Sequence, residues 1–275
     1  MSDLGLLSYY LGLEVKQKPG EIKISQSAYA QKIVEMAGMK GCNPVDTLME
    51  QHIKLLPGKP ELVLNATRYM SIVGSLRYLV NSRPDLSFSV GMVSRFMEAP
   101  NSEHWATIKR IIRYVAGTTE LGCKFVKGNN SELLGYTESD HAGDLVKRKS
   151  TTGVVFFLGD NIVTWSSQKQ RVVSLSSCES EYIAAATGAC QGVWLSRLLA
   201  DLNQTEVKRF RLLIDSKSAE ELSRNPVYHE RTKHIDTRVE LEHVSTDNQL
   251  ADILTKPLGR IRFAEMRRQL GIVKV

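Results

Sequence analysis

Acidic side chains occur in this sequence at positions where folded proteins commonly bind divalent cations. Glu181 lies in a predicted helix over residues 174–202, which starts with a capping box formed by Ser176 and Glu179. The helical period places Glu181 on one stripe with small and apolar residues: Ala184, Ala185, Gly188, Gly192, Leu195 and Leu199. A carboxylate at the head of a buried stripe needs a partner or a metal ion. The alternative is an edge position, from which Glu181 simply reaches water.

Further acids lie on three other predicted elements. Asp215 follows an apolar strand, and the carboxyl end of a strand is where α/β folds bind their ligands. Glu138 and Asp140 share one face of another strand, because side chains alternate with a period of two. Asp252 lies within two turns of a helix start. Acids on four elements suit a site that holds divalent cations through oxygen ligands.

The composition limits the class of protein. The chain has 275 residues, 42% of them hydrophobic, which allows one large or two modest domains. A net charge of +6 is compatible with a polyanionic partner but does not require one. We expect an intracellular protein, cytoplasmic or nuclear, because neither a signal peptide nor a membrane-spanning apolar run is present. The cysteines lack CxxC spacing and predict free thiols, and the five-residue spacing of His229 and His234 predicts no zinc site.

Residues 1–65 are predicted to form a hairpin over 7–26 around the turn Lys18-Pro19-Gly20, then a helix over 27–39 and an irregular connection. Residues 66–130 are predicted to form a helical connection and a tether. Its helices span 67–79, 85–97 and 102–116, and the tether spans 117–130.

Three basic residues lie opposite the apolar stripe of the helix over 102–116. They are Lys109, Arg110 and Arg113. A basic helix face can follow a nucleic-acid backbone. The alternative is an ordinary solvated surface, and the sequence leaves both possibilities open.

Residues 131–275 are predicted to form an α/β domain. Three antiparallel strands, a long helix and further strand–helix alternation predict a mixed five-stranded sheet flanked by helices. The predicted strands span 133–139, 152–159, 161–166, 210–214 and 239–244. Helices are predicted over 174–202 and 216–224, and a further one starts with Thr246 and Gln249 as its capping box.

Long stretches of the sequence resemble the Pol polyprotein of copia-type LTR retrotransposons. The stretches are LGLLSYYLGLEVKQ (4–17), ISQSAYAQKIVEMAGM (24–39), YMSIVGSLRYLVNSRPDLSFSVGMVSRFMEAPNSEHW (69–105), GYTESDHAGD (135–144), KSTTGVVFFLG (149–159), SLSSCESEY (174–182), HERTKHID (229–236) and NQLADILTKPL (248–258). The resemblance implies the end of a reverse transcriptase, in palm and thumb, followed by a ribonuclease H-like domain over 131–275. No polymerase activity is expected, because the YVDD-type paired aspartate of that family occurs nowhere in this sequence.

By the same resemblance, Glu181, Asp215 and Asp252 match the second, third and fourth acids of ribonuclease H, and Glu138 stands at the first. The implied activity is hydrolysis of the RNA strand of an RNA–DNA hybrid with Mg²⁺ or Mn²⁺, two ions in all, to which Asp140 can contribute. The implied further partner is the remainder of the Pol polyprotein.

Two departures from the family pattern favour a different function. The first acid is Glu138, where most copia-type sequences have Asp, and residues 235–244 lack about a dozen residues that usually precede the last strand. The alternative is therefore a catalytically decayed remnant that binds nucleic acid or another partner. Reuse as an interaction or effector protein is a third possibility, which no feature of the sequence specifically supports.

Overall fold

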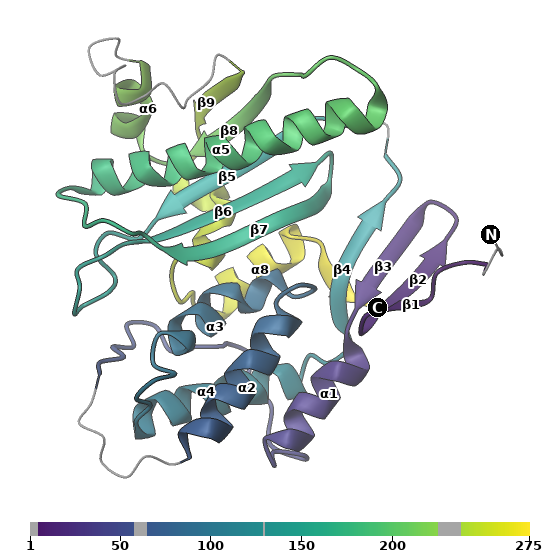
Figure 1. Ribbon diagram of the computed structural model, residues 1–275, viewed down its shortest axis with the longest axis vertical. Helices are drawn as coiled ribbons and strands as arrows, with labels where there is room; N and C mark the ends of the chain where they lie inside the picture. Colours follow the sequence, from purple (N-terminus) through teal and green to yellow (C-terminus); the bar gives the residue numbers. More distant parts are fainter. Residues whose placement is uncertain (1–4, 58–64, 129, 225–237) are drawn as a thin grey trace. The chain divides into compact units, whose positions relative to one another are not determined.

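The structure is a computed structural model, which describes residues 5–57, 65–128, 130–224 and 238–275 (Figure 1). The chain divides into two compact units, Met1–Lys127 with Pro257–Val275, and Gly128–Lys256. These units differ from the expected segments 1–65, 66–130 and 131–275, because residues 257–275 join the first unit. His229, His234 and the first residues of the shortened 235–244 segment lie outside the described residues.

The first unit contains a five-stranded antiparallel sheet with the strand order β1-β2-β3-β4-β10. Its elements are β1 (Tyr9–Tyr10), β2 (Leu13–Lys18), β3 (Glu21–Ser25), α1 (Ser27–Met36), α2 (Ala66–Leu79), η1 (Pro84–Leu86), α3 (Ser87–Ser94), α4 (Ser102–Ala116), β4 (Leu121–Val126), α8 (Arg260–Gln269) and β10 (Ile272–Lys274). The predicted hairpin is confirmed, with Lys18 paired to Glu21 across the turn. The single helix predicted over 85–97 is instead a 3-10 turn, η1, followed by the shorter α3.

The prediction of a tether over 117–130 is wrong for residues 121–126, which form β4 between β3 and β10. Cys123 is buried and pairs with Ile24 on one side and Ile272 on the other. Gly122 allows this close approach, because a Cβ there would lie 2.2 Å from the Ile24 carbonyl oxygen. The sequence did not predict β4, because its two partner strands, β3 and β10, lie far from it in the sequence.

The second unit contains a mixed five-stranded sheet with the strand order β7-β6-β5-β8-β9. Strands β5, β6 and β7 pair antiparallel, whereas β8 and β9 extend the sheet in parallel from β5. The elements are β5 (Leu133–Ser139), β6 (Thr151–Leu158), β7 (Asn161–Lys169), α5 (Ser177–Asn203), β8 (Phe210–Ile214), α6 (Lys217–Arg224), β9 (Val239–His243), η3 (Thr246–Asn248) and η4 (Leu250–Leu254). This arrangement confirms the predicted ribonuclease H-like sheet.

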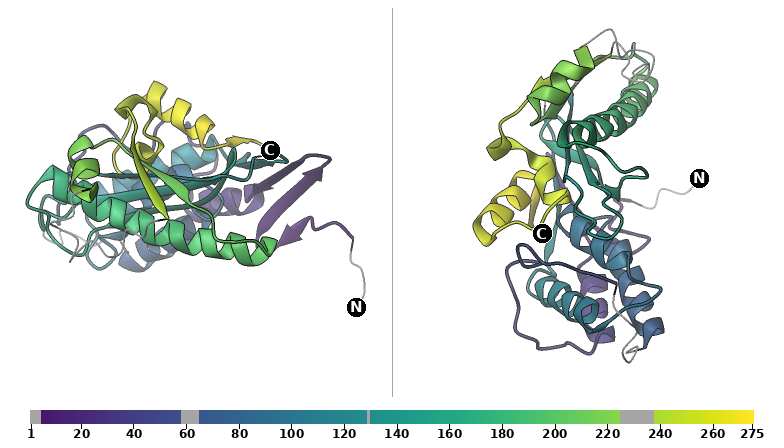
Figure 2. Two further views of the ribbon diagram at one scale, coloured as in Figure 1. Left: turned by 90° about the horizontal axis from the view of Figure 1, so that it is seen from above. Right: turned by 90° about the vertical axis from the view of Figure 1, so that its left-hand side faces the viewer.

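The long helix α5 lies across one face of this sheet (Figures 1 and 2). Its N-cap is Ser176, as predicted, and its small residues face the strands. A Cβ at Gly192 would lie 2.2 Å from the Phe210 ring, so only glycine permits this contact. The other face receives η4, which lies so close that a Cβ at Gly153 would reach 2.9 Å from the Ala251 carbonyl oxygen.

The helix predicted to begin at Thr246 is two short 3-10 turns, η3 and η4. Gln249 separates them, because its backbone is extended (φ −77°, ψ 96°) and its side-chain oxygen accepts a hydrogen bond from the Ala251 N–H. Gln249 therefore acts as the N-cap of η4 rather than as the third residue of an α-helix.

Along the parts of the chain that the structure describes, no helix combines the length and apolar character needed to cross a bilayer.

Candidate functional site

Strands β5 and β8 bring two of the predicted acids to the same edge of the second sheet. Glu138 lies near the end of β5, and Asp215 directly follows β8. The parallel pairing places Tyr136 opposite Leu213, so two residues further along Asp215 reaches the level of Glu138. The carboxyl ends of adjacent parallel strands therefore position both acids, as the sequence predicted.

Helix α5 supplies the third acid. Glu181 lies near the start of α5, and its Oε1 accepts a 3.1 Å hydrogen bond from the Ser139 N–H at the end of β5. Only 8% of the Glu181 residue surface is exposed, which excludes the alternative of an edge position in water. Its Oε2 is buried and has no hydrogen-bond partner among the residues that the structure describes.

The turn η4 supplies the fourth acid from the opposite face of β5. Asp252 is buried in η4, and the Thr255 hydroxyl at the end of this turn donates a hydrogen bond to Glu138 Oε2. The Gln249 side-chain amide donates a 3.0 Å hydrogen bond to the Thr137 carbonyl. These two contacts fix η4 against the end of β5 and hold Asp252 beside Glu138.

A lysine accompanies the acids. The Lys256 ammonium lies 2.7 Å from Asp252 Oδ1 and 3.3 Å from Glu138 Oε1. Lys256 follows Asp252 by four positions and reaches back over the turn. One cationic group thus bridges acids from two elements.

The acids influence one another's ionisation. Burial raises the pKa of Glu138 to about 8, and the Asp252 and Asp215 carboxylates add to the increase, although Lys256 opposes it. Burial likewise raises the pKa of Glu181 to about 9, with the charges of Glu138 and Asp215 contributing. These raised pKa values keep protons on Glu138 and Glu181 near neutral pH, and a bound divalent cation can displace those protons.

The four carboxylates suit a hard divalent cation, because such ions prefer oxygen ligands. Among the described residues, Glu181 Oε2 also has no hydrogen-bond partner and could accept such an ion. The four carboxylates are not a preformed cage. Within the described part of the chain, no three carboxylate, imidazole or thiol groups already stand at the spacing of ligands around one ion.

Asp140 has different neighbours from the other acids. Its Oδ1 accepts a hydrogen bond from the Thr151 N–H, and its Oδ2 lies against Gly143, where a Cβ would be only 2.1 Å away. The Asp140 N–H also donates to the Thr151 carbonyl. These contacts shape the loop after β5, and a role of Asp140 as a metal ligand stays a prediction.

The predicted basic face on α4 is largely engaged within the first unit. Arg110 contacts Glu50 at 3.0 Å and the Thr47 hydroxyl at 2.9 Å, and Arg113 donates a 2.7 Å hydrogen bond to the Asn43 carbonyl. Lys109 is exposed. Two of the three side chains therefore hold the connection after α1 against α4. A nucleic-acid contact by Lys109, Arg110 and Arg113 stays a prediction.

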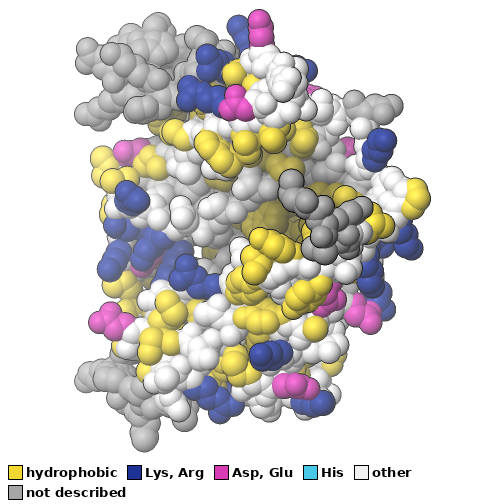
Figure 3. Space-filling view, turned by 45° about the vertical axis from the view of Figure 1, so that its right-hand side comes forward, with side chains coloured by type: hydrophobic (Ala, Val, Ile, Leu, Met, Phe, Trp, Pro, Cys, Tyr) yellow, Lys and Arg dark blue, Asp and Glu magenta, His cyan; other side chains and the backbone are white. Residues whose placement is uncertain are grey.

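Another basic group follows β5 and was not singled out from the sequence. Lys147, Arg148 and Lys149 occupy a turn whose backbone is organised by Asp144, which accepts hydrogen bonds from the N–H groups of residues 146 and 147. Arg171, after β7, lies beside this turn, because its carbonyl accepts a hydrogen bond from Lys149. The run of three consecutive basic residues, Lys147, Arg148 and Lys149, could have indicated this basic group from the sequence alone. On the face drawn in Figure 3, Lys and Arg side chains are spread over several places among hydrophobic ones.

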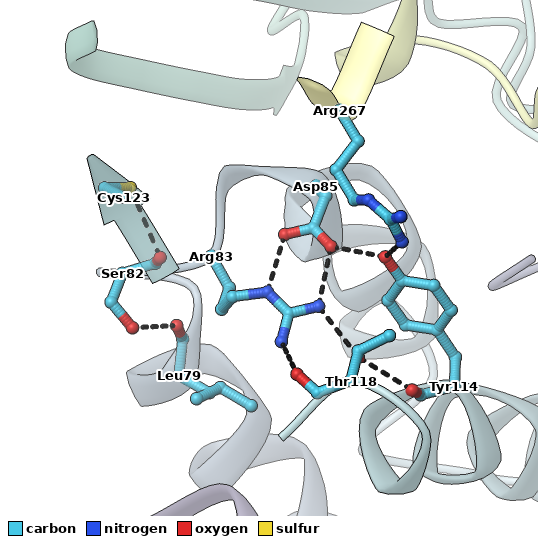
Figure 4. Close-up of polar contacts among 8 residues, drawn as sticks. All are labelled: Leu79, Ser82, Arg83, Asp85, Tyr114, Thr118, Cys123 and Arg267. Carbon is cyan, nitrogen blue, oxygen red and sulfur yellow. Dashed lines mark hydrogen bonds and ion pairs between the residues drawn. The ribbon is translucent and has the colours of Figure 1, made fainter. Parts of the chain in front are cut away.

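A second buried polar cluster lies in the first unit (Figure 4). The Arg83 guanidinium donates two hydrogen bonds to the Asp85 carboxylate, of 2.9 and 2.7 Å, and the Tyr114 hydroxyl donates another of 2.7 Å. Arg267 of α8 donates to the Tyr114 hydroxyl at 2.9 Å. The charges of Arg83 and Asp85 satisfy each other, which makes this cluster a structural junction between η1, α4 and α8.

The strand order of the second sheet, with the long helix α5 across one of its faces, makes the second unit ribonuclease H-like in its fold. A solved structure of the N-terminal RNase H domain of rv2228c from Mycobacterium tuberculosis, fused to maltose-binding protein, overlaps 50% of this chain and 98% of that chain, at 16% identity and a TM-score of 0.34. The family model for reverse transcriptase (RNA-dependent DNA polymerase) matches residues 1–51.

Two curated relatives match nearly the whole chain. It is 37% identical to the retrovirus-related Pol polyprotein from transposon RE2 of Arabidopsis thaliana, over 98% of this chain and 19% of that protein. It is 38% identical to the corresponding polyprotein from transposon TNT 1-94 of Nicotiana tabacum, over 99% of this chain and 22% of that protein. The chain belongs to the copia-type retrotransposon Pol polyprotein family, and it spans about a fifth of the length of these relatives.

Proposed function

We propose that the second unit is a ribonuclease H that hydrolyses the RNA strand of RNA–DNA hybrids with the help of divalent cations. The observation that carries this proposal is the convergence of Glu138, Glu181, Asp215 and Asp252 at one edge of the sheet. Hydrolysis of a phosphodiester requires a positioned water and neutralisation of the charge that develops on the phosphate. A carboxylate cluster meets this requirement by holding metal ions.

Glu138, Glu181, Asp215 and Asp252 would hold Mg²⁺ or Mn²⁺, two ions in all. When bound, the ions supply Lewis-acid stabilisation of the attacking and leaving oxygens. The protein's own contribution is positional. Ser139 orients Glu181, Thr255 orients Glu138, and Gln249 fixes the turn that carries Asp252.

The nucleic-acid partner is supported by the basic turn of Lys147, Arg148 and Lys149, together with Arg171. The turn belongs to the loop that leaves β5, the strand that carries Glu138. Lysine and arginine side chains bind phosphates without reading the sequence, and 2′-hydroxyl contacts distinguish RNA from DNA.

The decisive experiment is cleavage of a labelled RNA–DNA hybrid by the purified protein in Mg²⁺ or Mn²⁺. Asp215→Asn should reduce cleavage by about a hundredfold or more, the scale expected when one preorganised charged group is lost. Asp201→Asn, which changes an exposed acid on α5, is the matched control and should retain cleavage.

The alternative is a decayed, non-catalytic remnant, which the ion pairs of Lys256 and the longer side chain of Glu138 favour. If the parent is inactive and Glu138→Asp restores cleavage, one substitution has silenced an otherwise competent site. If neither protein cleaves, the ribonuclease proposal is wrong, and binding of the hybrid without cleavage would support the remnant.

A further inference from the structure

Two carboxylate oxygens of the acid site converge on one lysine nitrogen. Glu138 Oε1 and Asp252 Oδ1 belong to β5 and η4, yet both lie within ion-pair distance of the Lys256 ammonium. The other Glu138 oxygen is already engaged by the Thr255 hydroxyl. Lys256 therefore neutralises the Glu138 oxygen that Thr255 does not bind, together with one oxygen of Asp252.

Lys256 and the two acids differ in their exposure to solvent. The side chains of Glu138 and Asp252 are 6% and 5% exposed, whereas that of Lys256 is 38% exposed. Lysine carries a compact, strongly hydrated charge on a flexible stem, so its ammonium can move into water while the carboxylates stay in place. Burial lowers the pKa of Lys256, but Glu138 and Asp252 raise it above its usual range, so the group stays charged.

We propose that Lys256 is the resident counter-cation of the acid site, which holds Glu138 and Asp252 together in the metal-free protein and competes with divalent cations for them. This inference rests on the proposed function, because it takes the acids as ligands of a divalent ion. Because the Lys256 ammonium lies beside both oxygens, a divalent ion that binds the two of them together must displace it. Lys256 thereby weakens the site's affinity for metal while preventing carboxylate repulsion in its absence.

The test is direct binding of Mn²⁺, measured by the electron paramagnetic resonance signal of the free ion, without substrate. Lys256→Gln removes the competing charge, and its dissociation constant for Mn²⁺ should fall on the order of tenfold, within the usual range of coupling between two ligands. Lys256→Arg keeps the charge and should bind Mn²⁺ no more tightly than the parent.

The matched control is Lys169→Gln. Lys169 forms a 2.8 Å ion pair with Asp144 and has a similarly exposed side chain, but it contacts none of the four acids. Its loss should leave Mn²⁺ affinity unchanged. In EDTA, the melting temperature of Lys256→Gln should be lower than that of the parent. Added Mn²⁺ should remove this difference in melting temperature. A cooperative melting transition also shows that the variant folds.

Equal or weaker Mn²⁺ binding by Lys256→Gln, with clear binding by the parent, would overturn the role of Lys256 and leave the proposed function intact. Absence of Mn²⁺ binding by every variant and the parent would overturn both. If Lys169→Gln lowers the dissociation constant for Mn²⁺ as much as Lys256→Gln does, the proposal is also overturned. The tighter binding would then come from the lower net positive charge of the protein and not from the place of Lys256 in the site.

Discussion

The Gln249 side-chain amide donates a 3.0 Å hydrogen bond to the backbone carbonyl of Thr137. Thr137 precedes Glu138 on β5, and Gln249 precedes the turn that carries Asp252. Because Gln249 is fully buried, this hydrogen bond is shielded from water, and it ties the turn that carries Asp252 to the strand that carries Glu138.

Replacement of Gln249 by Ala should destabilise the protein by about 1–3 kcal/mol, because it leaves the Thr137 carbonyl buried without this donor and removes the cap of η4. Urea denaturation followed by circular dichroism measures the loss. Asn248→Ala, at the exposed neighbouring position, is the control. Equal stability of the two variants would contradict a positioning role for Gln249.

Stability in EDTA should fall as the pH rises from about 5 to 8. The folded-state pKa values of Glu138 and Glu181 are about 8 and about 9, above the unfolded value of about 4.3. The native state therefore holds protons that the unfolded state has released, and stability decreases by up to about 1.4 kcal/mol per pH unit for each group.

Glu181→Gln should flatten this decline, because the amide stays neutral at every pH, whereas Glu206→Gln at an exposed position should not. Melting temperatures between pH 5 and 8 provide the comparison. A parent whose stability is constant or rises over this range would refute the buried, protonated state of the two acids.

Loss of the buried ion pair in the first unit should be severe. Asp85→Asn leaves the Arg83 guanidinium buried without its counter-charge and should cost about 3–5 kcal/mol. Asp46→Asn breaks an exposed pair with Arg260 and should change stability by less than about 1 kcal/mol. Chemical denaturation of both variants distinguishes them, and similar small losses would show that the cluster in Figure 4 is not a structural junction.

Gly192→Ala should lower the melting temperature, because the new methyl group meets the Phe210 ring and overpacking costs about 1–3 kcal/mol. Gly74→Ala is the matched change in α2, where, apart from the helix's own neighbouring backbone, none of the described atoms lies within 4 Å of the added Cβ. That variant should be neutral or more stable, since alanine favours a helix by up to about 1 kcal/mol over glycine. A tolerated Gly192→Ala would mean that α5 can shift away from the sheet.

The sequence predicted the fold best where the signal for a helix or strand lies within the residues of that same element. The capping box at Ser176 and the small-residue stripe predicted α5 and its buried face, because both signals are local, but they left open whether Glu181 itself is buried or reaches water. The apolar run before Asp215 predicted β8 in the same way. Local patterns therefore singled out all four acids. The pairing of β5 with β8 brings Glu138 and Asp215 to the same edge, whereas Glu181 and Asp252 are brought there by the packing of α5 and η4 on the sheet.

Contacts between distant segments were not predictable from local patterns. β4 was missed because its partners lie in residues 21–25 and 272–274, and nothing near Cys123 indicates either. Lys256 and Thr255 were overlooked as members of the site for a related reason. Their significance depends on which oxygens of Glu138 they face, and that is decided by the packing of η4 on β5.

The pairing of β4 with β10 has a consequence for synthesis of the chain. Residues 272–274 leave the ribosome only after all of Gly128–Lys256 has been made. The second unit can therefore fold while the first still lacks a strand, against the usual order in which earlier segments finish first. Until β10 arrives, one edge of β4 has no partner for its backbone groups, and such an edge invites pairing with other chains. The first unit thus exposes this strand edge until residues 272–274 have been synthesised.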